Sequence, residues 1–141
     1  MKESLDQERA RFAWEKVQRQ TEEYTKLAKG APALIMQSGL MPVLAFFNEK
    51  ARKNSAPHRD LLEHLCHWLQ RQFNGRIEEP RFRENPFQAV MQALMGTSGN
   101  NAPGHAQFYR MATEEVLSIL RWIRQFAAAV GGGNEGGRAN G

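Results

Sequence analysis

The chain has 141 residues, of which 41% are hydrophobic and 24% charged, and its formal net charge is +4. This length suits one domain with a core large enough for independent stability, and it leaves no room for a second core. A single cysteine, Cys66, excludes an internal disulfide and suits a reducing compartment, so we expect a cytoplasmic protein. The charged N-terminus is no signal peptide, and no apolar run approaches the roughly 20 residues that span a bilayer, so no membrane contact is expected.

Apolar residues recur at helical spacing along the chain, and no segment shows the alternation that is typical of a strand. We therefore expect an all-α fold, a compact single-domain bundle of five to six helices over residues 1–130. A glycine-rich tail over residues 131–141 is expected to be disordered. The expected helices cover residues 5–29, two short segments within 31–53, and residues 56–73, 86–95 and 106–130.

Glycine and proline residues set the expected boundaries in the first half of the chain. Gly30 is expected to cap the first helix, and Pro32 to occupy the first turn of the next, where its missing N–H costs nothing. Gly39 would close that second helix, and Pro42 would begin the third. The connections at 76–85 and 97–105 are expected to be loops.

Residues 29–50 carry the most specific pattern in the chain. It consists of a lysine, Pro-x-Leu-Ile, Gly-Leu, Leu-Ala-Phe and a second lysine, at Lys29, Pro32, Leu34, Ile35, Gly39, Leu40, Leu44, Ala45, Phe46 and Lys50. This pattern resembles the signature of the small all-helical subunit of type III-B CRISPR effector complexes, the Cmr complexes. Less specific matches extend the resemblance over roughly residues 10 to 130, at Ala13, Trp14, Val17, Tyr24, Leu27 and Ala28, at His64 to Leu69, and at Tyr109, Arg110, Thr113, Glu114, Leu117, Leu120, Trp122, Ile123, Phe126 and Ala127.

The resemblance implies a non-catalytic structural subunit of an RNA-guided ribonucleoprotein in antiviral defence. Its partners would be other Cmr subunits, including copies of itself stacked head to tail, which requires two different complementary faces. These copies would line a groove that holds guide RNA paired with target RNA. No cofactor and no small-molecule substrate are implied.

Basic side chains are the candidates for contact with the RNA backbone. On the last helix Arg110, Arg121 and Arg124 fall within about 60° of one another, opposite the apolar stripe. The full set of candidates is Lys26, Lys29, Lys50, Arg52, Lys53, Arg110, Arg121 and Arg124. Helix-dipole complementarity and solubility alone would explain about half of them. Since no aromatic residue is clearly interleaved with them, we expect sequence-independent contact along one channel wall rather than base recognition.

Two tryptophans lie at the edges of the apolar stripes, Trp14 on the first helix and Trp122 on the last. Such positions suit core packing, and they also leave room for a contact with another subunit, because tryptophan is enriched at interface hot spots.

No arrangement of residues indicates an enzyme or a metal site. His64, Cys66 and His67 share one helix but not one face, so we expect two surface histidines and a buried thiol rather than a ligand set. No nucleophile with a positioned base and no converging set of carboxylates is found.

Two other functions remain open on the residues alone. One is a stand-alone helical nucleic-acid-binding domain, and the other is a protein-interaction adaptor without a role in RNA binding. The helix after Gly39 is too apolar to be a recognition helix of a helix-turn-helix. Salt separates the two functions, because phosphate contacts weaken steeply with ionic strength and an apolar docking surface does not.

Overall fold

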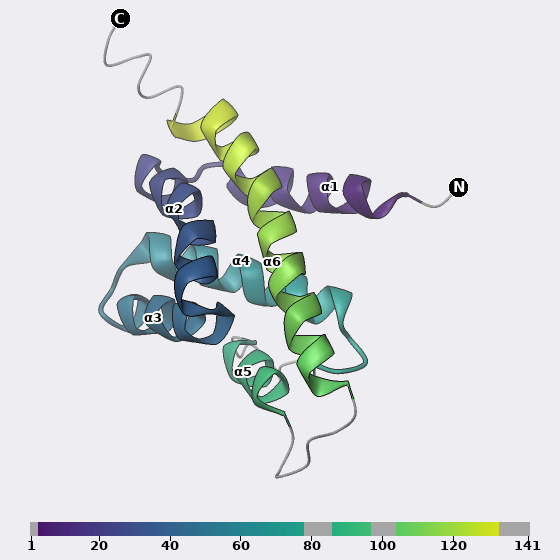
Figure 1. The fold of residues 1–141 in the computed structure, drawn as a ribbon. Coiled ribbons are helices and arrows are strands. Elements are labelled where there is room, and N and C mark those ends of the chain that lie inside the picture. The colour runs from purple at the N-terminus through teal and green to yellow at the C-terminus, as the bar shows by residue number, and fades with distance from the viewer. Residues whose placement is uncertain (1–2, 78–85, 97–103, 133–141) are drawn as a thin grey trace, which may run out of the picture.

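A computed structural model of the chain describes residues 3–77, 86–96 and 104–132. These residues form six α-helices and a short π-helical turn, with no β-strand among them, which confirms the all-α expectation (Figure 1). The elements are α1 (Leu5–Val17), α2 (Glu22–Ser38), α3 (Leu40–Arg52), α4 (Ala56–Gln72), α5 (Phe87–Met95), α6 (His105–Ala127) and the π-helical turn (Ala128–Gly132). The expected disordered tail lies outside the described residues from 133 onward, while its first two glycines belong to the π-helical turn.

The long helix α6 packs against α1, α2 and α4 (Figure 1). Helix α1 crosses its C-terminal half, α2 packs along one side of it, and α4 packs against α2, α3 and α6. Large side chains from several helices fill the space between them, among them Trp68, Tyr24 and Phe47, which are fully buried. Because α2 and α6 pack against each other over this core, their exposed faces lie next to each other at the surface.

The first expected helix, residues 5–29, is wrong as a single element, because the chain breaks between Val17 and Glu22. Arg19 takes a positive φ of 68° at the break, a conformation that is uncommon for non-glycine residues. Thr21 then caps α2, since its hydroxyl accepts a hydrogen bond from the N–H of Tyr24 at 3.1 Å. Two acidic residues follow in the first turn, where they complement the helix dipole.

The expected helix boundary at Gly30 and Pro32 is also wrong, because α2 continues through both residues to Ser38. Pro32 has no N–H, so one carbonyl of the preceding turn lacks its intrahelical donor. The helix persists because its buried positions keep helical spacing across this point, at Tyr24, Ala28, Ala31 and Ile35.

Gly39 is the joint between α2 and α3, as expected. Its N–H donates to the carbonyl of Ile35 at 2.7 Å, and its φ of 93° and ψ of 160° lie in a region open almost only to glycine. Pro42 lies in the first turn of α3, as expected. The boundaries of α4, α5 and α6 agree with the expected segments to within a few residues.

One polar network fastens α1 to the centre of the bundle. The guanidinium of Arg9 donates to both carboxylate oxygens of Glu115, at 2.7 and 2.8 Å, and the indole N–H of Trp68 donates to the same carboxylate at 2.9 Å. The network thus joins α1, α4 and α6. Although burial alone would raise the pKa of Glu115, the hydrogen bonds from Arg9 and Trp68 outweigh it and lower that pKa.

Among the helices that the structure describes, none is both long enough and apolar enough to cross a membrane.

Candidate nucleic-acid interface

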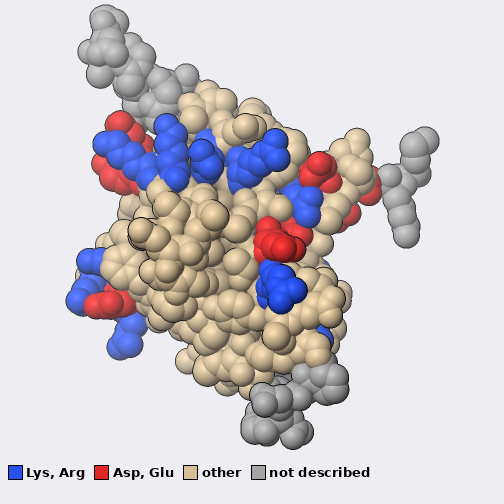
Figure 2. Space-filling view, viewed as in Figure 1, with Lys and Arg blue, Asp and Glu red and all other residues tan. Residues whose placement is uncertain are grey.

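Three of the predicted backbone contacts meet between α2 and α6. Lys29 projects from α2, and Arg121 and Arg124 project from α6, and all three are exposed. Together with Gln125 and Ala128 they line a surface hollow of about 400 Å³, which we call the α2–α6 pocket. Figure 2 shows lysine and arginine side chains gathered in a row over this region of the molecule.

The positive charge of the α2–α6 pocket is not neutralised within the described part of the chain. Among those residues, no carboxylate lies within ion-pair distance of Lys29, Arg121 or Arg124, and none lines the pocket. Like charges that are gathered without counter-charges raise the local positive potential and attract anions. Two guanidinium groups and an amide also supply several N–H donors for oxygen ligands.

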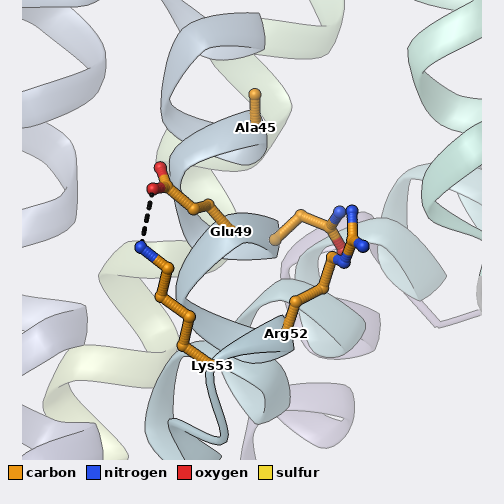
Figure 3. Close-up of a pocket in the computed structure, with 5 residues that line it drawn as sticks. Ala45, Glu49, Arg52 and Lys53 are labelled. Carbon is orange, nitrogen blue, oxygen red and sulfur yellow. Dashed lines mark hydrogen bonds and ion pairs between the residues drawn. The ribbon is translucent and has the colours of Figure 1, made fainter.

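A second group of cations lies at the C-terminal end of α3, where Figure 2 shows basic and acidic side chains together. Arg52 and Lys53 line a hollow of about 470 Å³ with Ala45, Asn48 and Glu49. Lys53 forms an ion pair with Glu49 at 3.2 Å, and Arg52 points away from this pair (Figure 3). This hollow therefore carries less net charge than the α2–α6 pocket.

The remaining predicted contacts line neither of these two hollows. The ammonium group of Lys50 lies over the ring of Phe46, 5.4 Å from its centroid. Lys26 pairs with Glu22 at 3.9 Å, and Arg110 is exposed in the first half of α6. The structure thus brings three of the eight candidates together in one pocket and places Lys50, Arg52 and Lys53 in a second group.

The two tryptophans that sequence analysis marked as edge positions come together through a third aromatic residue. The ring of Trp14 on α1 meets that of Phe126 on α6 edge to face, with centroids 5.4 Å apart. Trp122 lies against the same Phe126 at 5.7 Å. Sequence analysis named Phe126 only as part of the family pattern and did not connect it with the tryptophans, although its position four residues after Trp122 indicates a shared face.

The histidines and the cysteine of α4 do not share an environment. Cys66 is fully buried, as expected, and burial raises the pKa of its thiol, which disfavours the reactive thiolate. His64 is only partly exposed, and its Nδ1 lies 2.7 Å from the hydroxyl of Tyr24, whereas His67 is exposed as expected. Burial, with a smaller effect from Lys16, lowers the pKa of His64 to about 4. In the described ranges, no group of three or more His, Cys, Asp or Glu residues is placed to hold a metal ion.

Two side chains to which sequence analysis gave no structural role hold the helices around the site in place. Glu115 ties α6 to α1 and α4, and the hydroxyl of Tyr109 accepts a hydrogen bond from the N–H of Met41 at 3.0 Å, which ties α6 to the start of α3. The sequence offers no local signal for either contact, because the partners are far apart along the chain.

A comparison with known protein families assigns the chain. Residues 5–130 match the model of a family described as CRISPR-associated protein (Cas_Cmr5). The match includes all six α-helices, both groups of cations and the aromatic residues of α1 and α6. The chain therefore belongs to this family, the small subunits of type III-B CRISPR effector complexes, and is a Cmr subunit.

Proposed function

We propose that this subunit is a non-catalytic structural component that holds the backbone of RNA in the α2–α6 pocket. The observation that carries the proposal is the convergence of Lys29, Arg121 and Arg124, from two helices, without a carboxylate partner among the described residues. Phosphate groups are the anions that a guide or target RNA presents at regular spacing. Contacts to phosphates position a strand without recognising its sequence, as an RNA-guided complex requires of a structural subunit.

The chemistry of the pocket suits phosphate oxygens. Arginine presents a planar set of N–H donors that can engage two oxygens at once, and lysine adds a mobile point charge. The group at the end of α3, with Lys26 and Arg110, would supply additional and weaker contacts, because Lys26 and Lys53 already share their charge with glutamates. In this proposal copies of the subunit stack with other Cmr subunits beside guide RNA paired with target RNA, in a cytoplasmic complex for antiviral defence.

The test compares two triple variants in the assembled complex. Lys29→Gln, Arg121→Gln and Arg124→Gln together remove the three positive charges that line the pocket. Arg11→Gln, Arg59→Gln and Arg71→Gln remove the same number of charges from cations that have acidic partners and are not among the candidate contacts. RNA affinity is measured over a range of salt concentrations, and size-exclusion chromatography verifies assembly.

The pocket variant is expected to bind RNA more weakly and with a shallower salt dependence. The slope of log affinity against log salt should fall by roughly 0.7–0.9 for each phosphate contact that is lost. Equal affinities and equal slopes for the two variants would contradict the proposal and favour a protein-interaction adaptor.

A further inference from the structure

A surface hollow between α1, α4 and α6 has no part in the proposed contact with RNA. It has a volume of about 350 Å³, and Leu5, Phe73 and Met111 give it an apolar lining. Leu5 is 40% exposed and Met111 is 46% exposed, and the ring of Phe73 is held edge to face against that of Phe108, with centroids 5.3 Å apart. We call this feature the α1–α6 hollow. Its size and lining suit one large apolar side chain.

The charge of the α1–α6 hollow differs from that of the α2–α6 pocket. Two glutamates line the hollow, and Glu115 is neutralised by Arg9 at 2.7 Å. Glu114 has no cation within ion-pair distance among the described residues. A carboxylate without a counter-charge repels phosphate and attracts cations, so the hollow suits apolar and basic side chains of a protein rather than RNA.

The same chain carries a surface of the opposite kind towards the end of α3. Phe46 is 41% exposed, and its ring contacts those of Phe47 and His58, at centroid distances of 6.2 and 5.9 Å. The ammonium group of Lys50 lies over the Phe46 ring, and in the described ranges no carboxylate lies within ion-pair distance of it. We call Phe46 and Lys50 the α3 knob. Because neighbouring rings already orient Phe46, its burial in a partner would cost little conformational entropy.

The α3 knob and the α1–α6 hollow lie at opposite ends of α4. His58, in the first turn of α4, contacts Phe46, whereas Phe73, directly after the last turn, lines the hollow. A helix of 17 residues is about 25 Å long, so a molecule cannot place its own knob in its own hollow. Figure 1 shows α3 and the N-terminal end of α1 on opposite sides of the bundle. A contact between the two surfaces therefore requires two molecules.

We infer that the α1–α6 hollow is occupied by a second copy of this chain, whose Phe46 enters it and whose Lys50 pairs with Glu114. The contact is heterologous, because the two surfaces differ, and it leaves one knob and one hollow free for further copies. Neither surface includes a residue that lines the α2–α6 pocket, so each added copy would keep its pocket open. The inference rests on the part of the proposed function in which copies stack, and it assigns Lys50 to a protein contact instead of an RNA contact.

The contact is expected to be weak in the free protein. One aromatic side chain buries roughly 150–250 Å², whereas stable interfaces bury at least roughly 1,200 Å². It should therefore be measurable at high protein concentration, and it should be stronger in the assembled complex, where other contacts hold neighbouring copies together.

The first test reverses the two charges in the full chain without RNA. Lys50→Glu and Glu114→Lys each bring like charges together and should weaken self-association by about tenfold or more, measured by sedimentation velocity over a series of concentrations. The two substitutions in one chain exchange the charges and should restore most of the association, which a purely structural role of either residue would not do. Lys26→Glu and Glu23→Lys reverse charges on α2, outside both surfaces, and should leave association unchanged.

The second test locates the contact in the assembled complex. A photo-reactive benzoylphenylalanine in place of Phe46 should crosslink to the peptide of another copy that contains Met111 or Leu5, as identified by mass spectrometry. The length of α4 excludes a link within one molecule. The same photo-reactive residue in place of Met36, which is 78% exposed on α2, is the matched control and should not label the hollow.

The remaining outcomes contradict the inference. Crosslinks from position 46 to a different subunit, or to another part of a second copy, would mean that the hollow has another occupant. Charge reversals without rescue in the double variant would show that Lys50 and Glu114 do not face each other. A wild-type chain that stays monomeric at every concentration and gives no crosslink between copies would exclude the contact altogether.

These measurements are separate from the test of the RNA contact. A pocket variant that loses RNA affinity while the crosslink between copies persists would support both proposals. A pocket variant that keeps its RNA affinity would overturn the backbone role alone, because the contact between copies does not involve the pocket.

Discussion

The hydroxyl of Tyr109 on α6 caps the first turn of α3, where it accepts a hydrogen bond from the N–H of Met41 at 3.0 Å. The residue at the N-cap position, Gly39, has no side chain that could perform this function. The first N–H groups of a helix lack intrahelical partners, so a hydroxyl from another helix replaces the usual local cap. The contact also joins two segments of the family pattern, Gly39-Leu40 and Tyr109-Arg110.

The Tyr109→Phe variant should lower the free energy of unfolding by about 1–2 kcal/mol, because it leaves the N–H of Met41 without its partner. Urea denaturation measures the loss, and hydrogen exchange of the Met41 amide locates it. Tyr24→Phe is the matched control, since it removes the other tyrosine hydroxyl of the chain, which contacts His64. Unchanged protection of the Met41 amide in Tyr109→Phe would show that the cap contributes nothing.

The Glu115→Ala variant should be destabilised by roughly 2–4 kcal/mol, because it leaves the guanidinium of Arg9 and the indole N–H of Trp68 without their acceptor. The side chains of Arg9 and Glu115 are only 17% and 11% exposed, so solvent screens their interaction weakly. Glu114→Ala, at the exposed neighbouring position, should change stability by less than about 0.5 kcal/mol. Thermal unfolding of both variants checks the difference, and equal losses would mean that the network adds no stability.

Gly30, inside α2, and Gly39, at the C-cap of α2, should respond to alanine in opposite directions. Gly30 lies inside the helix, and a Cβ at this position would meet no atom within 4 Å, so Gly30→Ala should stabilise the protein by about 0.5–1 kcal/mol. Gly39 has a φ of 93°, so Gly39→Ala should destabilise it by about 1–3 kcal/mol. Chemical denaturation of both variants provides the measurement. A loss of stability in Gly30→Ala would contradict the continuous helix.

Stability should fall as the pH decreases from about 6.5 to about 4, in part because of His64. Burial, with smaller effects from Lys16 and His67 and against an opposing effect from Asp60, lowers the pKa of His64 to about 4. In this interval the unfolded chain binds a proton at His64 and the folded chain does not. Protonation of His64 in the unfolded chain therefore lowers the free energy of unfolding by up to about 1.4 kcal/mol for each unit of pH decrease in this interval. Above about pH 6.5 His64 does not affect the free energy of unfolding. Denaturation of His64→Gln should show a shallower pH dependence than wild type, and identical slopes would refute the assignment.

Sequence analysis located the second half of the fold well because local signals agree with the packing there. Ser55 and Pro57 mark the start of α4, and Gly96 marks the end of α5. The first half was divided wrongly for two physical reasons. The break at Arg19 contains neither glycine nor proline, and its only local signal is Thr21 followed by two glutamates. In α2, burial at helical spacing overrides the helix-breaking tendency of Gly30 and Pro32.

The basic residues of the candidate site could be predicted from the sequence, but their arrangement in space could not. Helical periodicity placed Arg121 and Arg124 on one exposed face of α6, and both lie there. Periodicity carries no information about which other helix packs beside that face, so the partnership with Lys29 emerges only from the tertiary structure. The same holds for Trp14, whose neighbour Phe126 lies on the opposite half of the chain.

The division of the α2–α6 pocket between two distant helices has a consequence during synthesis. A nascent chain that has emerged only as far as α2 presents Lys29 but neither arginine, and the core face of α2 still lacks α6. Since folding on the ribosome proceeds from the N-terminus, the trio of cations forms late. In the proposed function, a truncated or misfolded subunit would lack this trio and would therefore bind RNA poorly.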